Sequence, residues 1–237
     1  MPSYQVKLAG REQLAKGTLV FRFETPAGFT FKAGRAVVLE LLDPPAGDGQ
    51  KRRTFSLVSA PFESTLAIAA RMRDTAFKRA LKALPDGASV KLSGPIDQFT
   101  LADAARPAVS IAGGIGITPF MSMLREANRE RSTQSFLLLY SNRRGCRIPR
   151  RAAGARAEQR QLPAVRHDDR HGELRAQVGR RKRLAQRGRD TALCVGGLAA
   201  PVYYVVGPPA MVVAMQETLC GMGIAESDIR SEEFYGY

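Results

Sequence analysis

Residues 108–119 read AVSIAGGIGITP, an apolar run that leads through a glycine-rich turn to a threonine–proline pair. A strand that is apolar on both faces is typical of a parallel sheet covered on both sides. Thr118 fits the N-cap of a helix and Pro119 fits its first position, so we expect a helix over residues 119–131. The stretch therefore predicts a strand, a tight turn and a helix, which is the repeating unit of an α/β domain.

The glycines of this turn are Gly113, Gly114 and Gly116. They would let a ligand approach backbone N–H groups at the positive end of the following helix, where a diphosphate is the natural ligand. The motif is neither GxGxxG nor the lysine-containing phosphate loop. A tight strand-to-helix turn with no ligand is the alternative interpretation.

Further elements of the same kind follow. We expect apolar strands over residues 136–140 and 202–206, the second followed by Gly207-Pro208-Pro209 and another helix. Open α/β sheets bind ligands at the carboxyl ends of their strands, so the two turns are expected to face one crevice. The tail, residues 229–237 (IRSEEFYGY), is at its simplest a terminal edge strand.

The first 100 residues have a different pattern. Short alternating or apolar runs are separated by Gly, Pro and Asp, which is typical of an antiparallel sheet or barrel. The expected strands are 4–8, 19–24, 36–42, 53–58, 65–71 and 89–92, with one helix over 75–84. We predict a two-domain α+β chain: an antiparallel Greek-key β-barrel over 1–103, then a parallel-sheet α/β domain over 104–237.

Residues 52–57 (RRTFSL) carry a second candidate binding site. Alternation along a strand places Arg53 and Phe55 on one side and Thr54 and Ser56 on the other. An arginine can bind a phosphate through two hydrogen bonds, and an aromatic ring can lie against a flat ligand. Judged on this stretch alone, a surface arginine beside a core phenylalanine is the simpler interpretation.

The composition limits the function classes. The 237 residues are 44% hydrophobic and 24% charged, as in an ordinary globular protein, and no apolar run is long enough to span a membrane. The N-terminus lacks the layout of a signal peptide, and Cys146, Cys194 and Cys220 include no CxxC pair. We expect a cytoplasmic protein without a disulfide framework, a zinc site or an iron–sulfur cluster.

The net charge of +14 lies almost entirely in one segment. Residues 143–189 hold sixteen basic and four acidic residues, a net charge of +12. Over about residues 145–195 neither strand alternation nor a sustained helical stripe is present. The positive net charge is therefore a property of this Arg-rich segment, and the rest of the protein is close to neutral.

Three interpretations of the Arg-rich segment are open. It is an insert that binds nucleic acid, a solvated loop without fixed structure, or the product of two compensating frameshifts in a GC-rich gene. About 65 residues separate Asn142 from Gly207 although the expected elements are missing, which favours the frameshifts. Under that hypothesis His167 and His171 have no role, and the alternative reading frames of the coding DNA provide the test.

Taken together, RRTFSL, AGGIGITP and the C-terminal GPP and SEEFYGY stretches resemble the ferredoxin–NADP⁺ reductase family of flavoproteins. The resemblance covers about residues 3–144 and 196–237. It implies that Arg53 holds the flavin phosphate, that Phe55 packs on the isoalloxazine and that Ser56 lies near its N5 atom. Thr54 belongs to the same signature stretch. Further flavin contacts are implied for Arg71, Met72, Arg73, Phe77 and Lys78.

The same resemblance implies a site for a nicotinamide nucleotide. The glycine-rich turn, with Gly113, Gly114, Gly116, Thr118 and Pro119, would receive its diphosphate. Gly207, Pro208 and Met211 would flank the nicotinamide, although Val206 stands where many relatives have a cysteine. Asn142 and Arg143 are candidates for the adenosine end. The catalytic residues implied are Ser56 and Glu232 near the flavin, and Tyr237 over the ring face.

The function implied is transfer of a hydride from NADPH or NADH to FAD, followed by electron transfer to an external acceptor. That acceptor would be a small redox protein such as ferredoxin or flavodoxin, an oxygenase component, a cytochrome or a small molecule, with no role for nucleic acid, metal or membrane. FMN is the alternative flavin, because Lys78 stands where a serine is frequent. Two other functions stay open: a nucleic-acid-binding protein that uses the Arg-rich segment, and a reductase that binds flavin but is catalytically impaired.

Overall fold

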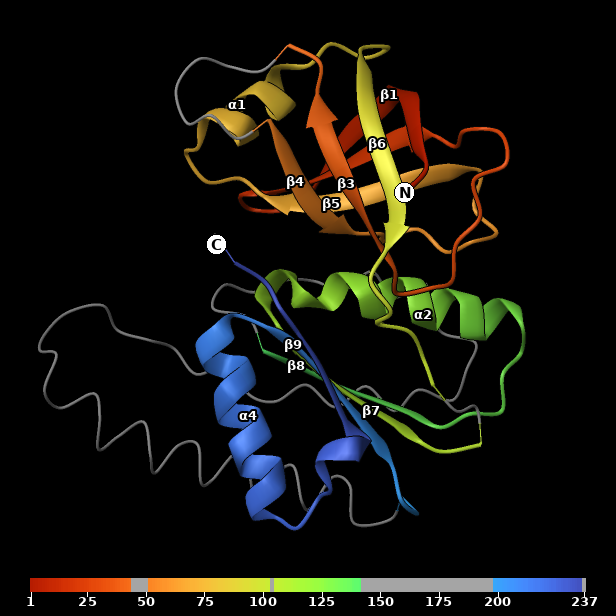
Figure 1. Cartoon of the computed structure of the whole chain (residues 1–237), viewed down its shortest axis with the longest axis vertical. Helices are drawn as coiled ribbons and strands as arrows, with labels where there is room; N and C mark the ends of the chain where they lie inside the picture. The colour runs from red at the N-terminus through yellow and green to blue at the C-terminus, as the bar shows by residue number, and fades with distance from the viewer. Residues whose placement is uncertain (44–50, 103–104, 142–197, 236–237) are drawn as a thin grey trace, which may run out of the picture.

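The computed structural model describes residues 1–43, 51–102, 105–141 and 198–235 (Figure 1). The Arg-rich segment, Asn142, Arg143, Tyr237 and the predicted domain boundary at residues 103–104 lie outside these residues. The described chain forms two sheets that lie one above the other, with helix α2 (Thr118–Arg129) between them (Figure 1). In the described ranges, no helix has the length and apolar character needed to cross a membrane.

The N-terminal domain is a six-stranded antiparallel sheet, as the alternating runs predict. Across the sheet the strands are β4 (Arg52–Ser56), β3 (Ala36–Leu41), β6 (Ser89–Ile96), β1 (Ser3–Ala15), β2 (Thr18–Glu24) and β5 (Thr65–Arg71). Strand β6 lies between β1 and β3, so the order is that of a Greek key and not of a simple meander. Helix α1 (Ala76–Ala83) follows β5, and the Thr75 side chain caps it by accepting a hydrogen bond from the Lys78 N–H.

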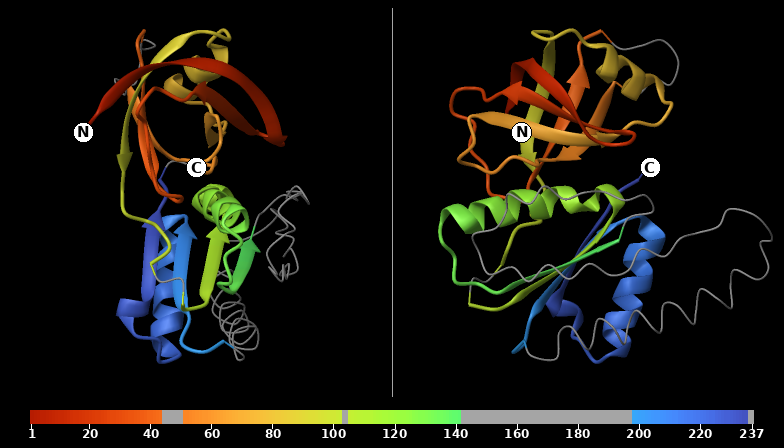
Figure 2. Two further views of the ribbon diagram at one scale, coloured as in Figure 1. Left: turned by 90° about the vertical axis from the view of Figure 1, so that its right-hand side faces the viewer. Right: turned by 180° about the vertical axis from the view of Figure 1, so that it is seen from behind.

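The sheet curls because β1 has two partners (Figure 2). Residues 3–7 pair with β6, whereas residues 8–15 pair with β2 with two register shifts. Such irregularities bend a strand and increase its twist. The concave side holds an apolar core, whose fully buried members include Leu8, Phe21, Phe23, Leu39 and Phe77.

The predicted barrel is not closed by a ladder. Between β4 and β5, the two ends of the sheet, the described residues form one isolated bridge, Leu57–Ile68. The Leu57 N–H donates to the Arg35 carbonyl, but the next N–H, that of Val58, donates to Ala67. Consecutive N–H groups of a strand point to opposite sides, so the chain here bonds to both of its neighbours. The pairing with β5 does not extend beyond this bridge in the described residues, and the domain is a curled antiparallel sheet.

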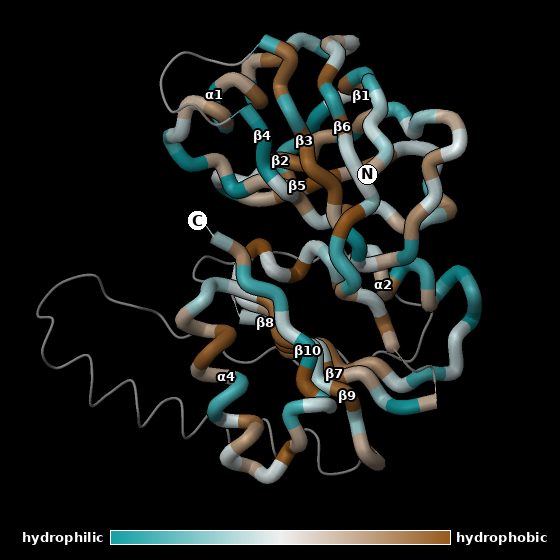
Figure 3. The backbone as a smooth tube through the Cα atoms, viewed as in Figure 1, coloured by the Kyte–Doolittle hydropathy of each residue, from teal (hydrophilic) through white to brown (hydrophobic). Residues whose placement is uncertain are grey.

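The C-terminal domain holds a parallel sheet, as predicted. Its order is β10 (Ile229–Glu233), β9 (Val202–Gly207), β7 (Ala108–Gly113) and β8 (Phe136–Ser141). Helix α2 packs on one face of the sheet and α4 (Pro209–Gly221) on the other (Figures 1 and 2). Because both faces are covered, the central strands are hydrophobic along their length (Figure 3).

The glycine-rich turn is itself helical. Residues Gly114–Ile117 form a short 3₁₀ helix, η1, which runs directly into α2. Thr118 is therefore the first residue of α2 with a helical backbone and a buried side chain, and it caps nothing. The prediction of Thr118 as N-cap is wrong because an N-cap needs an extended backbone, which the preceding 3₁₀ turn does not leave. Pro119 is the second residue of the helix, one position later than predicted.

Candidate functional site

A pocket of about 340 Å³ lies where the two domains meet. Its walls come from β4, β5 and the start of α1 on one side, and from the glycine-rich turn and the C-terminal tail on the other. The lining residues are Arg53, Thr54, Phe55, Ser56, Ala69, Ala70, Arg71, Thr75, Lys78, Ile115, Thr118, Glu232, Glu233, Phe234 and Tyr235. Segments far apart in the sequence thus meet at one site.

One end of the pocket is strongly cationic. Arg53, Arg71 and Lys78 line it, and Arg73 is close enough to act on the same lysine. Burial lowers the pKa of the Lys78 ammonium, and the positive charges of Arg73, Arg53 and Arg71 lower it further. The start of α1 adds the positive end of a helix. Cations crowded in this way are stabilised by an anion, so this end of the pocket is suited to a phosphate.

An aromatic wall lies beside the cations. The Phe55 ring packs against the buried Phe77 ring, with centroids 6.3 Å apart and planes inclined by 28°. The Arg53 guanidinium lies 5.6 Å from the centroid of the same Phe77 ring. Arg53 and Phe55 therefore lie on the same side of β4, as strand alternation predicts. Phe77 supports both residues from the core and does not line the pocket.

Two buried polar atoms in the pocket have no protein partner. The Ser56 hydroxyl and the Oε2 atom of Glu232 are buried, and neither is hydrogen-bonded within the described structure. Burial, and secondarily the negative charge of Asp97, raises the pKa of Glu232 from 4.5 to about 7. Buried polar groups are normally hydrogen-bonded, and leaving them unpaired costs free energy. A ligand with polar atoms at this place would supply the missing partners.

Strand β10 places Glu232 in the pocket. It runs parallel to β9, with Glu232 opposite Val206 and Glu233 opposite Gly207. The Phe234 N–H then donates to the Gly207 carbonyl, which ties the tail to the second strand-to-helix turn. The tail is therefore an edge strand that also carries pocket residues to the carboxyl end of the sheet.

The two strand-to-helix turns, which were expected to face one crevice at the carboxyl ends of β7 and β9, pack against each other, and only the first of them lines the pocket. A Cβ atom added at Gly113 would lie 2.3 Å from the Met211 sulfur, and one added at Gly116 would lie 2.4 Å from the Val206 carbonyl oxygen. Gly114 differs, because it has a φ of +58° and open space around it. Close packing thus accounts for Gly113 and Gly116, whereas the positive φ accounts for Gly114, which has open space beside its α-carbon.

Replacing Gly116 with alanine should destabilise the protein by about 1–3 kcal/mol, because the new methyl group would overlap a backbone carbonyl that cannot rotate away. Gly221→Ala is the control. Gly221 ends α4 with nothing within 4 Å of an added Cβ, so alanine there should be neutral or stabilising. Urea unfolding of both variants is the measurement, and equal stability for the two would contradict the packing argument.

The predicted site residues fall into three groups. The pocket is lined by Arg53, Thr54, Phe55, Ser56, Arg71, Lys78, Thr118 and Glu232. Others lie behind or beside it: Met72, Arg73, Phe77, Gly113, Gly114, Gly116, Pro119, Gly207, Pro208 and Met211. Asn142, Arg143 and Tyr237 lie outside the described residues.

Sequence reasoning missed several lining residues. They are Ala69, Ala70, Thr75, Ile115, Glu233, Phe234 and Tyr235. A signal was present for some of them, because small residues on β5 leave room for a ligand and Thr75 starts α1. For the tail residues the signal is the acidic–aromatic sequence itself. The family resemblance points to Tyr237 as the residue over the flavin ring, and among the described residues Tyr235 lines the pocket.

Comparison with known proteins agrees with this architecture. Residues 111–217 match the family model described as an oxidoreductase NAD-binding domain. The phthalate dioxygenase reductase of Burkholderia cepacia is 32% identical over 146 residues, which is 59% of this chain and 43% of that protein. The carnitine monooxygenase reductase subunit of Escherichia coli is 30% identical over 227 residues, 94% of this chain and 64% of that protein. The chain therefore spans less than two thirds of the length of either relative.

The fold is that of solved reductases. A ferredoxin–NADP⁺ reductase from Neisseria gonorrhoeae, crystallised with bound FAD and NADP, aligns with a TM-score of 0.74 at 22% identity over 98% of this chain and 99% of that one. A curled antiparallel sheet followed by a parallel α/β sheet is the architecture that this chain shares with that reductase. The described chain thus has the two-domain fold of ferredoxin–NADP⁺ reductases, and residues 111–217 are similar to oxidoreductase NAD-binding domains.

Proposed function

We propose that the chain is an NAD(P)H-dependent flavoprotein reductase that holds FAD in the pocket between its domains. The observation that carries the proposal is the pair of unpartnered polar atoms, on Ser56 and Glu232, in a pocket that also has a cationic end and an aromatic wall. A flavin has the complementary parts: a phosphate, a flat ring system and a polar ring edge. The two relatives named above are reductases and give no support to a nucleic-acid-binding role for the Arg-rich segment.

When bound, the flavin and the nicotinamide supply the hydride chemistry, and the flavin passes electrons on one at a time or as a pair. The chain supplies binding and orientation. Arg53, with Arg71 and Lys78, would bind the phosphate, and Phe55 would support the ring system. Ser56 and Glu232 would hydrogen-bond the polar ring edge. Because the pKa of Glu232 is raised to about 7, its carboxyl group can donate a hydrogen bond near neutral pH.

The nicotinamide nucleotide would bind at the paired turns. The open space beside Gly114 and the start of α2 at Thr118 are suited to its diphosphate. Gly207, Pro208 and Met211 would flank the nicotinamide, and Asn142 and Arg143 would contact the adenosine end. Tyr237 would cover the flavin ring, a role for which Tyr235 in the pocket lining is a second candidate. The flavin released on denaturation distinguishes FAD from FMN. The rates of flavin bleaching by NADPH and by NADH distinguish the two donors.

The acceptor would be a separate redox partner such as ferredoxin, flavodoxin or an oxygenase component, with the reaction in the cytoplasm. The support for this acceptor comes from the names of the relatives, which include the reductases of a dioxygenase and of a monooxygenase. A small redox protein would have to approach the pocket, where Tyr235 has 78% of its surface exposed.

The purified protein should be yellow, and it should release FAD on denaturation. Under anaerobic conditions its flavin absorbance should be bleached by NADPH or by NADH in stopped-flow mixing, and the faster donor identifies the preferred nucleotide. Failure of the protein to bind FAD or FMN at micromolar concentrations would overturn the proposed function. Bound flavin that neither nucleotide bleaches would show the catalytically impaired reductase instead.

A further inference from the structure

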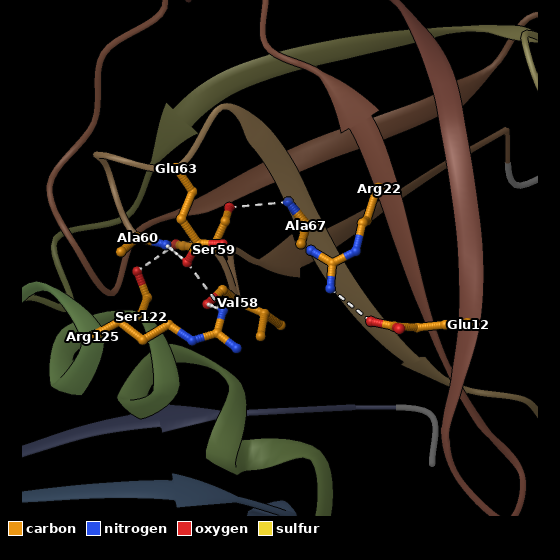
Figure 4. Close-up of polar contacts among 9 residues, drawn as sticks. All are labelled: Glu12, Arg22, Val58, Ser59, Ala60, Glu63, Ala67, Ser122 and Arg125. Carbon is orange, nitrogen blue, oxygen red and sulfur yellow. Dashed lines mark hydrogen bonds and ion pairs between the residues drawn. The ribbon is translucent and has the colours of Figure 1, made fainter. Parts of the chain in front are cut away.

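Helix α2 contacts the segment that joins β4 to β5, residues 57–64, which we call the β4–β5 connection (Figure 4). The two elements belong to different domains, and both begin at the pocket. Ser56 lines the pocket directly before the connection, and Thr118 lines it as the first residue of α2. Their mutual position therefore sets how the two walls of the pocket face each other.

Two side chains of α2 bind the backbone of the connection. The Ser122 hydroxyl donates to the Ser59 carbonyl at 2.7 Å, in a contact where both serines are fully buried. The Arg125 guanidinium donates to the Val58 carbonyl at 3.1 Å, and through the same nitrogen to the Glu63 carboxylate at 3.1 Å (Figure 4). Arg125 thus holds both ends of the connection at once.

The connection is also held from within. Glu63 Oε1, which accepts from Arg125, accepts from the Ala60 N–H at 2.9 Å as well. The Ser59 hydroxyl accepts from the Ala67 N–H on β5 at 3.0 Å. A displacement of Arg125 would therefore be transmitted to a connection that has little freedom of its own.

An apolar cluster continues this contact into the pocket wall. Val20, Val58, Ala67 and Ala69 of the N-terminal domain pack with Ile115 and Met121 of the C-terminal domain. Ala69 and Ile115 both line the pocket. The cluster would keep the domains attached without Arg125, but apolar packing is non-directional and does not fix one orientation as hydrogen bonds do.

We propose that Arg125 is a positioning residue for the hydride step: by binding Val58 and Glu63 it fixes the separation between the Ser56 wall and the Thr118 wall of the pocket. This role rests on the proposed function, because these walls would hold the flavin and the nicotinamide nucleotide. Reaction between two bound groups is very sensitive to their distance, and a misplacement of about 1 Å costs on the order of 100-fold in rate. Arg125 itself does not line the pocket.

Arg125→Met tests the role, with Arg106→Met as the matched control. Arg106 also binds a carboxylate, that of Asp228, and two backbone carbonyls, those of Ala200 and Pro201. These three partners belong to the C-terminal domain, as Arg106 does. The side-chain exposures are similar, 33% for Arg125 and 32% for Arg106. Arg125→Met should slow flavin bleaching by saturating nucleotide about tenfold and leave the flavin Kd within twofold. Arg106→Met should leave both unchanged, and Arg125→Lys should restore part of the rate.

A distance measurement separates this proposal from the proposed function. Spin labels on Cys220 and on Asp86→Cys, with Cys146 and Cys194 replaced by serine, report the separation of the domains by pulsed electron resonance. The distribution should be narrow in the parent and in Arg106→Met, and broader or displaced in Arg125→Met. An unchanged distribution in Arg125→Met, or an equal rate loss in both variants, would overturn the positioning role. A parent that neither nucleotide bleaches would overturn the proposed function, and the distances would still decide whether Arg125 fixes the walls.

Discussion

Replacing Arg53 with methionine should weaken flavin binding by about 10- to 150-fold. Arg53 lies at the cationic end of the pocket, where a phosphate would accept its hydrogen bonds. A hydrogen bond to a charged group contributes about 1.5–3 kcal/mol, which corresponds to that range in Kd. Without flavin the change should cost little stability, because Arg53 is one of the positive charges that lower the pKa of Lys78 and its removal relieves repulsion. Titration of flavin into the flavin-free protein and thermal unfolding give the two quantities.

Arg52→Met is the matched control for this prediction. Arg52 precedes Arg53 on β4, is exposed and does not line the pocket, so its removal should change the flavin Kd less than threefold. If the Arg53→Met protein had the flavin Kd of the parent, the flavin phosphate would not bind at this end of the pocket. Equal weakening in the two variants would instead assign the effect to the overall positive charge of β4.

The strands could be predicted where local alternation and burial agree. Residues 65–71 were expected as a strand and form β5 with the same bounds, because the run is apolar and nearly fully buried. Strand β1 was expected over 4–8 but extends to Ala15. Its second half is mostly exposed and shows no apolar alternation, and the partner that makes it a strand is β2. The second half of β1 is therefore a strand because it pairs with β2, and not because its residues have a high β-propensity.

Ligand-facing residues could be predicted within one element but not across elements. Alternation placed Arg53 and Phe55 together on β4, and the glycine pattern located the turn that holds Ile115 and Thr118. The contacts of α2 were not found, because Arg125 and Glu63 are 62 positions apart and no local pattern joins them. Thr118 was misread as an N-cap for a related reason, since the 3₁₀ turn before it depends on packing with the β9 turn.

The flavin-free protein should lose about 3 kcal/mol of stability between pH 4.5 and pH 8, and Glu232→Gln should abolish this loss. Burial, and after it the charge of Asp97, raises the pKa of Glu232 from 4.5 to about 7. In this interval the folded protein keeps a proton that the unfolded chain releases, so stability is complete below pH 4.5 and falls as the pH rises through 7. A shift of this size corresponds to about 3 kcal/mol at 1.36 kcal/mol per pH unit. Urea unfolding of parent and variant at several pH values measures it.

Two neighbouring carboxylates provide the controls. Glu233 lies on the same strand and pairs with the Tyr235 hydroxyl, and Glu233→Gln leaves the buried carboxyl of Glu232 in place, so the pH slope should persist. Asp97→Asn removes only the second cause of the raised pKa, so the slope should become smaller without vanishing. A parent slope retained in Glu232→Gln would show that Glu232 ionises freely in the folded protein. Its carboxyl group could then not donate a hydrogen bond to the flavin near neutral pH, and that part of the proposed chemistry would have to be reassigned to Ser56.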